Sequence, residues 1–372
     1  MSHFRVVATS GHARAGTLTT RHGEVDTPAF MPVATQASVK ALSPAEVAGT
    51  GARLVIMNTY HLWLRPGPEI VHAHGGLHSF ARWPHAIATD SGGFQAYSIA
   101  QRFRETPDGF ELSSHLDGSR RLLTPEESLR VQVLLGTDIA LQLDVCPPAG
   151  APRRDVERAL ERTTAWAKRS LAARPDGQVL YGIVQGGTDV ELRLRHAAEL
   201  AALPLDGLAL GGFSVGEAPA RMHETLAAVV PNVDAARPRY LMGVGTPSDL
   251  VRAICCGVDL FDCVMPTRNA RNGQAFVRGG RLVIKNARYK DDPSPIEPGC
   301  GCPACAGGFG RAYLRHLFQA GEILAHRLLT LHNLHHYQEL VREGRAAIVA
   351  GEVEGWARSR LGDERGPAPL DA

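Results

Sequence analysis

The chain has 372 residues, of which 44% are hydrophobic and 21% charged, and its formal net charge is only +2. This composition is typical of a globular protein with a large core, and it excludes a uniformly basic nucleic-acid binder. There is no apolar signal segment and no apolar run of bilayer length, so we expect a cytoplasmic protein. Seven cysteines in such a chain favour metal or thiol chemistry over a disulfide framework.

One pattern recurs along the chain: a short apolar run ends in a polar or glycine-rich cluster, and a helix signal follows. Eight segments fit this pattern, namely 28–35, 53–61, 86–94, 139–146, 179–187, 207–217, 239–247 and 258–264. Strands that alternate with helices form parallel sheets with right-handed crossovers, and eight such units close into a barrel. We therefore predict an α/β fold built on a (β/α)8 TIM barrel.

Local signals support this organisation. At 43–46, 124–127 and 246–249 a Ser or Thr precedes a proline, and an acid stands three positions after the Ser or Thr. This pattern predicts a helix N-cap and a capping box or its Asp variant. Residues 16–28 predict a hairpin ahead of the barrel, and 110–124 predict a second hairpin, inserted after the third strand and turning at an Asp-Gly pair.

Three cysteines, Cys300, Cys302 and Cys305, stand together in the stretch GCGCPAC. Thiolates this close favour a structural zinc site over free or redox-active cysteines, and histidine is the usual fourth ligand. The helical stretch that follows offers His316, His326, His332, His335 and His336, and the residues alone do not choose among them. A catalytic metal is disfavoured because nothing indicates an open coordination position.

These signals divide the chain into three expected parts. Residues 1–280 form the barrel with its N-terminal hairpin and the catalytic site, 281–340 a C-terminal zinc-binding subdomain, and 341–372 a last helix and a flexible tail. From Met265 to Lys290 there are seven Lys or Arg residues and no Asp or Glu. Such a one-sided run is either a solvated face or a patch that contacts phosphates.

Active sites of TIM barrels lie at the C-terminal ends of the strands. The predicted strand ends carry Asn58, Asp90, Asp144, Gln185, Gly211, Gly212, Met242 and Asp262. Asp90 and Asp262 suit cleavage at an anomeric carbon, where one carboxylate attacks and the other handles protons. Asp144 and Gln185 have the acceptors and donors that read the edge of a planar heterocycle, and Phe94 offers a ring that stacks on it.

Asp262 also has a simpler interpretation. It stands at the tip of an apolar strand, just ahead of Arg268 and Arg271. A strand-end acid is often salt-bridged to a nearby arginine, and a buried carboxylate is costly unless it is paired or used. The two interpretations differ in one testable respect, because a tight salt bridge would neutralise a nucleophile.

Several segments together resemble one enzyme family. They are TDSGGFQ (89–95), YGIVQGG (181–187), GGFSVGE (211–217), RYLMGVGTP (239–247), FDCVMPTRNARNGQAF (261–276) and the cysteine cluster with LHN (331–333) downstream. In this order they resemble the tRNA-guanine transglycosylases of bacterial type, the queuine tRNA-ribosyltransferase family. The similarity runs from about residue 10 to about residue 340.

The resemblance implies base exchange in the anticodon loop of tRNAs with a G-U-N anticodon. The wobble guanine is flipped out, and the aspartate matching Asp262 attacks the ribose anomeric carbon to give a covalent intermediate. A 7-deazaguanine base then enters, and the aspartate matching Asp90 takes its proton. The arginines matching Arg268 and Arg271 bind the nucleotides that flank the guanine. The family also implies a homodimer, although no interface can be recognised in this sequence.

The resemblance also assigns the base pocket, to Ser91, Phe94, Asp144, Gln185, Gly211, Gly212, Phe213, Glu217 and Met242. Within it, Gln185 and the Gly212 amide should bind the carbonyl oxygen of the base, and Asp144 its N–H edge. The Phe213 carbonyl should meet the 7-substituent, and Glu217 should support the peptide at the pocket floor. Phe94 and Met242 should sandwich the ring. By the same alignment, His332 is the fourth zinc ligand.

Departures from the family pattern affect the incoming base. Residues 144–146 read Asp-Val-Cys where many bacterial relatives have Asp-Glu-Cys, and Phe213-Ser214 stand where Leu-Ala is common. Both flank the pocket for the incoming base, so 7-aminomethyl-7-deazaguanine and the bulkier queuine stay open. Val215 matches the pattern of a smaller bacterial pocket and favours the aminomethyl base.

Three other functions remain in view. The family includes non-catalytic, zinc-stabilised RNA-binding subunits, and the presence of both Asp90 and Asp262 argues against that function. Archaeal-type enzymes act in the D-loop and carry long C-terminal RNA-binding extensions, whereas this sequence ends soon after its last helices. A nucleoside hydrolase would pass the covalent intermediate to water.

Overall fold

The molecule is built around a parallel barrel. The computed structural model describes residues 3–98 and 102–362, so the predicted flexible tail lies outside the described residues. The strand order is β4-β14-β13-β12-β11-β10-β6-β5. These strands are β4 (Ala29–Pro32), β5 (Leu54–Met57), β6 (Ala86–Thr89), β10 (Ile139–Leu141), β11 (Val179–Val184), β12 (Gly207–Leu210), β13 (Arg239–Leu241) and β14 (Leu260–Cys263). The Ala34 N–H donates to the Ile56 carbonyl at 2.8 Å and joins β4 to β5. All eight predicted strands are confirmed.

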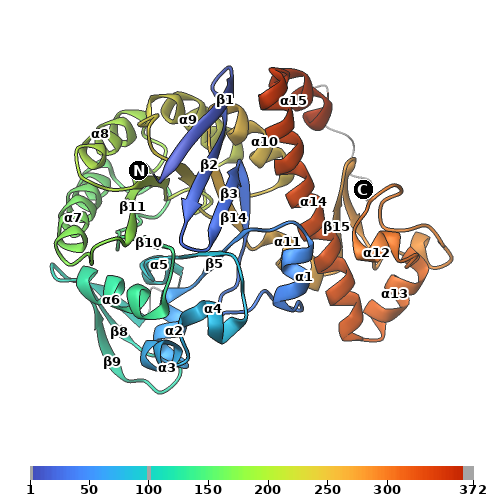
Figure 1. Ribbon diagram of the computed structural model, residues 1–372, viewed down its shortest axis with the longest axis horizontal. Helices are drawn as coiled ribbons and strands as arrows, with labels where there is room; N and C mark the ends of the chain where they lie inside the picture. The colour runs from blue at the N-terminus through green and yellow to red at the C-terminus, as the bar shows by residue number, and fades with distance from the viewer. Residues whose placement is uncertain (1–2, 99–101, 363–372) are drawn as a thin grey trace.

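Helices surround the barrel and connect its strands (Figure 1). They are α1 (Pro44–Gly49), α2 (Thr59–Leu64), α3 (Pro68–Ala73), α4 (Gly76–Ala81), α5 (Phe94–Ser98), α6 (Pro125–Leu135), α7 (Arg153–Ala172), α8 (Val190–Ala201), α9 (Pro219–Val229), α10 (Pro247–Cys256) and α11 (Met265–Arg271). Their apolar residues recur at helical spacing and face inward; α10 buries Leu250, Ala253 and Ile254 in this way. The predicted TIM-barrel fold is therefore correct.

Two of the three predicted capping boxes form. Ser43 and Glu46 at the start of α1, and Thr246 and Asp249 at the start of α10, each exchange side-chain to backbone hydrogen bonds. At α6 the Thr124 side chain accepts a hydrogen bond from the Glu127 N–H, but the cap lacks the reciprocal bond from the Thr124 N–H to the Glu127 carboxylate. The carboxylate there binds the Arg130 guanidinium instead, at 2.7 and 2.8 Å, so that part of the prediction is wrong.

A small antiparallel sheet covers the N-terminal end of the barrel. Its strands are β1 (Phe4–Ser10), β2 (Ala13–Thr20) and β3 (Gly23–Thr27). Phe4, Leu18 and Val25 of this sheet share a hydrophobic cluster with barrel residues such as Tyr181 and Leu260. The predicted hairpin is β2 and β3, whereas β1 was not expected, because most of its residues are exposed and show no alternating apolar pattern.

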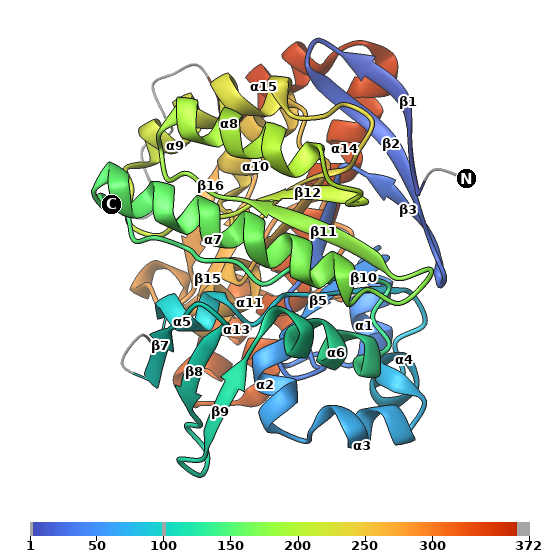
Figure 2. The same ribbon diagram turned by 90° about the vertical axis from the view of Figure 1, so that its left-hand side faces the viewer.

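The second predicted hairpin is also present. It forms β8 (Phe110–Ser113) and β9 (Arg120–Leu123), and β7 (Phe103–Glu105) pairs with β8 to complete a three-stranded sheet. Gly118, in the turn, has a φ of +74°, which glycine adopts without strain. Figure 2 shows this sheet extending beyond the barrel, on a different side from β1–β3.

The cysteine cluster belongs to a separate hydrophobic cluster beside the barrel. It involves β15 (Gln274–Val277), β16 (Gly280–Val283), α12 (Pro303–Ala306), α13 (Arg311–Gln319) and part of α14 (Ile323–Ala350). Together these elements form a lobe beside the barrel. Helix α14 lies between the rest of this lobe and the barrel, and α15 (Val353–Leu361) packs near the C-terminal end of α14 (Figure 1). The division into three domains stays a prediction; α14 itself runs through position 340, where one boundary was expected.

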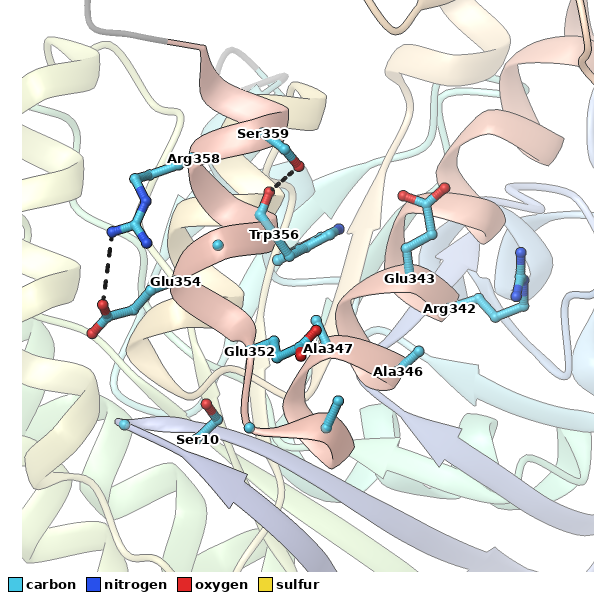
Figure 3. A pocket seen from close by; sticks show the side chains of 14 residues that line it. Ser10, Arg342, Glu343, Ala346, Ala347, Glu352, Glu354, Trp356, Arg358 and Ser359 are labelled. Carbon is cyan, nitrogen blue, oxygen red and sulfur yellow. Dashed lines mark hydrogen bonds and ion pairs between the residues drawn. The ribbon is translucent and has the colours of Figure 1, made fainter.

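A groove of ≈ 1060 Å³ lies between α14, α15 and the turn that follows β1 (Figure 3). Trp356 and Arg358 on α15 and Ser10 at the turn contribute to its walls. It contains none of the residues predicted for catalysis or metal binding. Within residues 3–98 and 102–362, no helix combines the length and apolarity that a bilayer crossing requires.

Candidate active site and metal centre

The barrel brings the predicted strand-end residues to one rim of the molecule. Asp262 is the third residue of β14, while Asp90 and Met242 directly follow β6 and β13. Gln185 and Gly211 directly follow β11 and β12. Because all eight strands are parallel, these residues share the rim where barrel enzymes carry their catalytic groups.

Asp262 is held by neutral donors. Its Oδ1 accepts hydrogen bonds from the Tyr240 hydroxyl at 2.6 Å and from the Gly243 N–H at 2.8 Å. Burial raises the pKa of Asp262, although these two hydrogen bonds oppose the rise. The carboxylate is thus oriented by its neighbours without being neutralised by a cation.

The expected alternative, a salt bridge from Asp262 to Arg268 or Arg271, is not found among the described residues. Both arginines lie on α11, directly after β14. Arg268 is exposed, and the Arg271 guanidinium donates to the Thr267 carbonyl at 2.9 Å. No described carboxylate pairs with either one, which suits them to phosphate binding. Their contact with RNA stays a prediction.

Asp90 is bound on both carboxylate oxygens. Oδ1 accepts from the Thr59 N–H at 2.9 Å and the Gly92 N–H at 3.2 Å, while Oδ2 accepts from the Asn58 amide. Burial raises the pKa of Asp90 to about 7, with a smaller contribution from the negative charge of Asp262, and the hydrogen bonds oppose this rise. A carboxylate with such a pKa can both accept and release a proton near neutrality.

Asp144 and Gln185 form a polar pair deep in the barrel. Gln185 Nε2 donates to Asp144 Oδ2 at 2.7 Å, and the Ser91 hydroxyl donates to Oδ1 at 3.3 Å. Burial raises the pKa of Asp144 to about 6. Gln185 Oε1 is buried without a hydrogen-bond partner among the described residues. The pair thus combines acceptors and donors on one surface, as recognition of a purine-like edge requires.

Two glycines let the backbone approach Gln185 closely. A Cβ added at Gly212, whose φ is +68°, would lie 2.3 Å from Gln185 Oε1, and one at Gly211 would lie 2.7 Å from Nε2. Beyond them Phe213 is buried. The Glu217 carboxylate accepts hydrogen bonds from the N–H groups of Ser214 and Val215, at 2.5 and 3.0 Å. Glu217 thus holds the backbone that follows Phe213, and the role of this peptide as the floor of a base pocket stays a prediction.

The two residues expected to sandwich the base differ in exposure. The Phe94 side chain, at the start of α5, is 47% exposed. Met242 is partly buried and packs against the hydrophobic cluster inside the barrel. Stacking on a flat ring would bury the exposed face of Phe94. The sandwich itself stays a prediction.

The cysteine cluster selects one histidine from five. The Sγ atoms of Cys300, Cys302 and Cys305 lie 3.7, 3.5 and 3.5 Å from His332 Nδ1. His332 Nε2 donates to the Phe276 carbonyl at 2.7 Å, which leaves Nδ1 to face the thiols as the ligand atom. Three thiolates and one imidazole at this spacing fit a closed tetrahedral zinc site, as predicted from the sequence.

A second group of possible metal ligands lies at the N-terminal end of the barrel, opposite the rim that carries Asp90 and Asp262. His22, in the β2–β3 turn, and His78, on α4, face the buried Asp138 at 2.8 and 3.1 Å, and their rings stack at 3.4 Å. The Ile87 N–H donates to the same carboxylate at 2.8 Å. Hydrogen bonds therefore satisfy Asp138, and the group fastens the hairpin to the barrel.

Two residues near the site were not singled out from the sequence. Tyr240 binds Asp262, and its position two residues before Met242 places both side chains on one face of the strand, a signal that was available. Arg193 is fully buried on α8, beside the glycines of the predicted base pocket. Arg193 lies on the same face of α8 as the buried residues His196 and Ala197, at helical spacing. A cation on a buried helix face is therefore the sequence signal that indicates an unusual role for Arg193.

Comparison with known proteins identifies the family. A family model described as queuine tRNA-ribosyltransferase matches residues 9–365. A queuine tRNA-ribosyltransferase of Sorangium cellulosum is 65% identical over 96% of this chain and 91% of its own length. Proteins of the same name from Syntrophobacter fumaroxidans and Aromatoleum aromaticum are 51% and 49% identical, covering 99% and 95% of this chain and 99% and 96% of their own lengths. The chain therefore belongs to the queuine tRNA-ribosyltransferase family, whose members are tRNA-guanine pentosyltransferases.

Proposed function

We propose that this protein exchanges the wobble guanine of tRNAs with a G-U-N anticodon for 7-aminomethyl-7-deazaguanine, in queuosine biosynthesis. The observation that carries the proposal is the pair of rim carboxylates, Asp262 and Asp90, whose charges interact and whose donors differ. One is oriented through a single oxygen, and the other has a pKa near neutrality. Family membership supports tRNA and a guanine-type base as the substrates.

The first step breaks the bond between the guanine and its ribose. A carboxylate oxygen of Asp262 forms a bond to the ribose C1′ while the C1′–N9 bond breaks, and the electron pair of that bond leaves with guanine, which takes up a proton from the protonated form of Asp90. Tyr240 and Gly243 bind Oδ1. Among the described residues Oδ2 accepts no hydrogen bond, so it is the oxygen free to attack.

The second step reverses the first with a new base. Asp90 removes the N9 proton of the incoming base, N9 bonds to C1′, and the bond to Asp262 breaks with its electron pair returning to the carboxylate. Two displacements at one carbon retain its configuration. The Asn58 amide and the Thr59 N–H keep Asp90 in place between these proton transfers.

The base pocket explains why a guanine-type base would be selected. Asp144 would accept N–H groups of the base, and Gln185 with the Gly212 amide would donate to its 6-oxo group. The pattern around Val215 favours the aminomethyl base over queuine. Zinc held by Cys300, Cys302, Cys305 and His332 would supply a structural cross-link and no step of the reaction.

Two further expectations accompany this function. Arg268 and Arg271 on α11 would contact phosphates of the anticodon loop beside the flipped guanine. The protein would act as a homodimer where mature tRNA is modified, in the cytoplasm. Sedimentation with and without an anticodon stem-loop would measure the number of chains in each complex.

The decisive experiment is incorporation of labelled guanine into unmodified tRNA of the G-U-N class. It is repeated with the 7-aminomethyl base and with queuine as competitors, and the stronger competitor identifies the incoming base. Label in the tRNA is the expected result. Binding of tRNA without label would instead favour the non-catalytic RNA-binding subunit. Release of free guanine without an acceptor base would favour a hydrolase.

A further inference from the structure

Arg193 connects the two segments that form one side of the base pocket. Its Nε donates to the Gly187 carbonyl at 2.5 Å, and its Nη2 donates to the Gly211 carbonyl at 2.9 Å. Longer contacts of 3.4 Å reach the carbonyls of Val184 and Gly212. One guanidinium on α8 therefore holds the backbone on both sides of Gln185 and the glycine pair after β12.

The part of the chain that the structure describes gives this cation no ion-pair partner. Among the described residues no carboxylate forms a salt bridge with Arg193, whose side chain is fully buried. Its guanidinium lies 3.7 Å from the centre of the Phe213 ring. Burial lowers the pKa of Arg193 to about 9, which still leaves it charged at neutral pH. A buried, unpaired cation is expensive, so its persistence beside a polar pocket calls for a functional explanation.

The geometry of the peptide group supplies that explanation. In a trans peptide the C=O of one residue and the N–H of the next point in opposite directions. Because Arg193 binds the Gly211 carbonyl, the Gly212 N–H is turned away from Arg193. A carbonyl bound to a cation also polarises its peptide, and this makes the N–H a stronger donor.

We propose that Arg193 is a positioning residue through which this protein selects bases that carry a 6-oxo group. It holds the Gly211–Gly212 peptide so that the Gly212 N–H faces the oxygen of the base, and it anchors the backbone beside Gln185, the second donor. This inference rests on the proposed base exchange, to which it adds the origin of base specificity. Arg193 itself touches neither the base nor the ribose.

The test compares guanine with 2-aminopurine, which lacks the 6-oxo group. The KM for labelled guanine and the inhibition constant of 2-aminopurine are measured for the unaltered protein and for Arg193→Met and Arg193→Lys. We expect the preference for guanine to fall about ten-fold or more in Arg193→Met, because the pocket loses an oriented donor. Lysine restores the charge but cannot bridge two carbonyls as a planar fork does, so it should rescue the preference only partly.

Arg345→Met is the matched control. Arg345 also bridges two backbone carbonyls, those of Gly16 and Thr27, but it does so between α14 and the N-terminal sheet. The Arg345→Met variant should have a lower melting temperature than the unaltered protein and the same preference for guanine over 2-aminopurine. If Arg193→Met weakens both bases equally, as a merely structural arginine would, the inference is overturned.

The outcome is separable from that of the proposed function. If the unaltered protein exchanges no guanine, the proposed function fails, and direct calorimetric binding of the two bases still measures the preference. If Arg193→Met does not fold, Arg193→Lys decides, since an unchanged preference in that variant contradicts the role of the bridged carbonyls.

Discussion

Asp262 shows how a buried carboxylate can be oriented by its neighbours without being paired with a cation. The hydroxyl and the N–H that hold it carry no net charge, so they orient the carboxylate without the neutralisation that an arginine would bring. Burial makes the charged form less stable, and in the proposed reaction this would favour attack on an electron-poor carbon. The neutral neighbours of Asp262 therefore matter as much as the acid.

We predict that Asp262→Asn abolishes exchange and stabilises the fold at alkaline pH. Asparagine keeps an oxygen for both hydrogen bonds but removes the buried charge. The folded-state pKa of Asp262 is raised, so ionisation destabilises the native state above pH 3.8 and does so fully above the folded pKa. The melting temperature should exceed that of the unaltered protein by roughly 2 °C at alkaline pH and match it in acid. Retention of exchange in this variant would disprove the nucleophile assignment.

The raised pKa of Asp90 predicts a pH profile. As a general base Asp90 must be ionised, so kcat/KM for the incoming base should rise with pH and level off above about 7. Asn58→Ala removes a hydrogen bond that favours the ionised form, and the inflection should move to higher pH. Rapid-mixing assays of the second displacement would measure both profiles. An inflection that stays in place in Asn58→Ala would assign the titration to another group.

At the scale of residues, the sequence predicts functional groups better than their partners. Asp90 and Asp262 could be chosen because strand ends of a barrel converge, which is a property of the fold class. The donors to Asp262 come from β13 and its loop, and no local pattern specifies that pairing. The partners of Arg193 are backbone carbonyls, which every residue has, so no pattern of side chains predicts them.

At the scale of elements, the β2–β3 hairpin is fastened to the barrel by one buried acid. Burial alone would raise the pKa of Asp138, yet hydrogen bonds from His78, His22 and the Ile87 N–H lower it overall. Arg21, beside them, donates to the Thr137 carbonyl. The charged form of Asp138 is thus favoured in the folded state, and its contribution to stability is lost as the pH falls below 3.8 through the lowered folded pKa.

We predict that His78→Ala destabilises the protein without changing exchange. It removes one hydrogen bond to a buried carboxylate, worth about 1.5–3 kcal/mol, at the end of the barrel away from the catalytic rim. Thermal unfolding and kcat would be measured on the same preparation. His74→Ala is the control, because His74 is exposed and its ring binds no carboxylate; it contacts the Ile70 carbonyl at 2.8 Å and the edge of the half-exposed Phe80 ring. A fall in kcat without a fall in melting temperature would contradict the structural role.

Elements were predicted well wherever their signals are local. The caps at Ser43 and Thr246 follow from four-residue patterns, and the hairpins follow from turn residues. The reciprocal bond at Thr124 failed because Arg130, one turn along α6, competes for the same acid. Strand β1 escaped prediction because an exposed strand pairs through its backbone and leaves little trace in its side chains.

At the scale of the whole molecule, the group of Cys300, Cys302, Cys305 and His332 joins the second lobe to α14, which packs against barrel strand β4. We predict about one zinc per chain, lost in Cys302→Ser together with several degrees of melting temperature. Metal analysis after dialysis would measure the loss. Cys255→Ser, on α10 and outside the cluster, should keep full zinc. Full zinc content in Cys302→Ser would refute the ligand set.

Spacing alone singled out three of the four residues that the structure brings together as a possible metal site. The fourth is separated from Cys305 by the whole of α13, so only the family resemblance favoured His332 over its four competitors. The overall barrel was predictable because eight strand signals recur with the same chemistry. The position of the lobe on the barrel could not be predicted in this way, because it depends on contacts between surfaces that are far apart in the chain.

Helix α14 connects the parts of the molecule. Near its middle His332 faces the cysteines, and Gln338 then donates to the carbonyl of Phe30 in β4, 308 residues earlier. Strand β4 in turn pairs with β14, whose residues begin at Leu260. A ribosome delivers the chain from its N-terminus, so the first barrel strand can join β5 early but waits for most of the protein to be made before it gains β14 on its other side. The barrel should therefore close late in synthesis, and until then its strands must be kept from pairing with other chains.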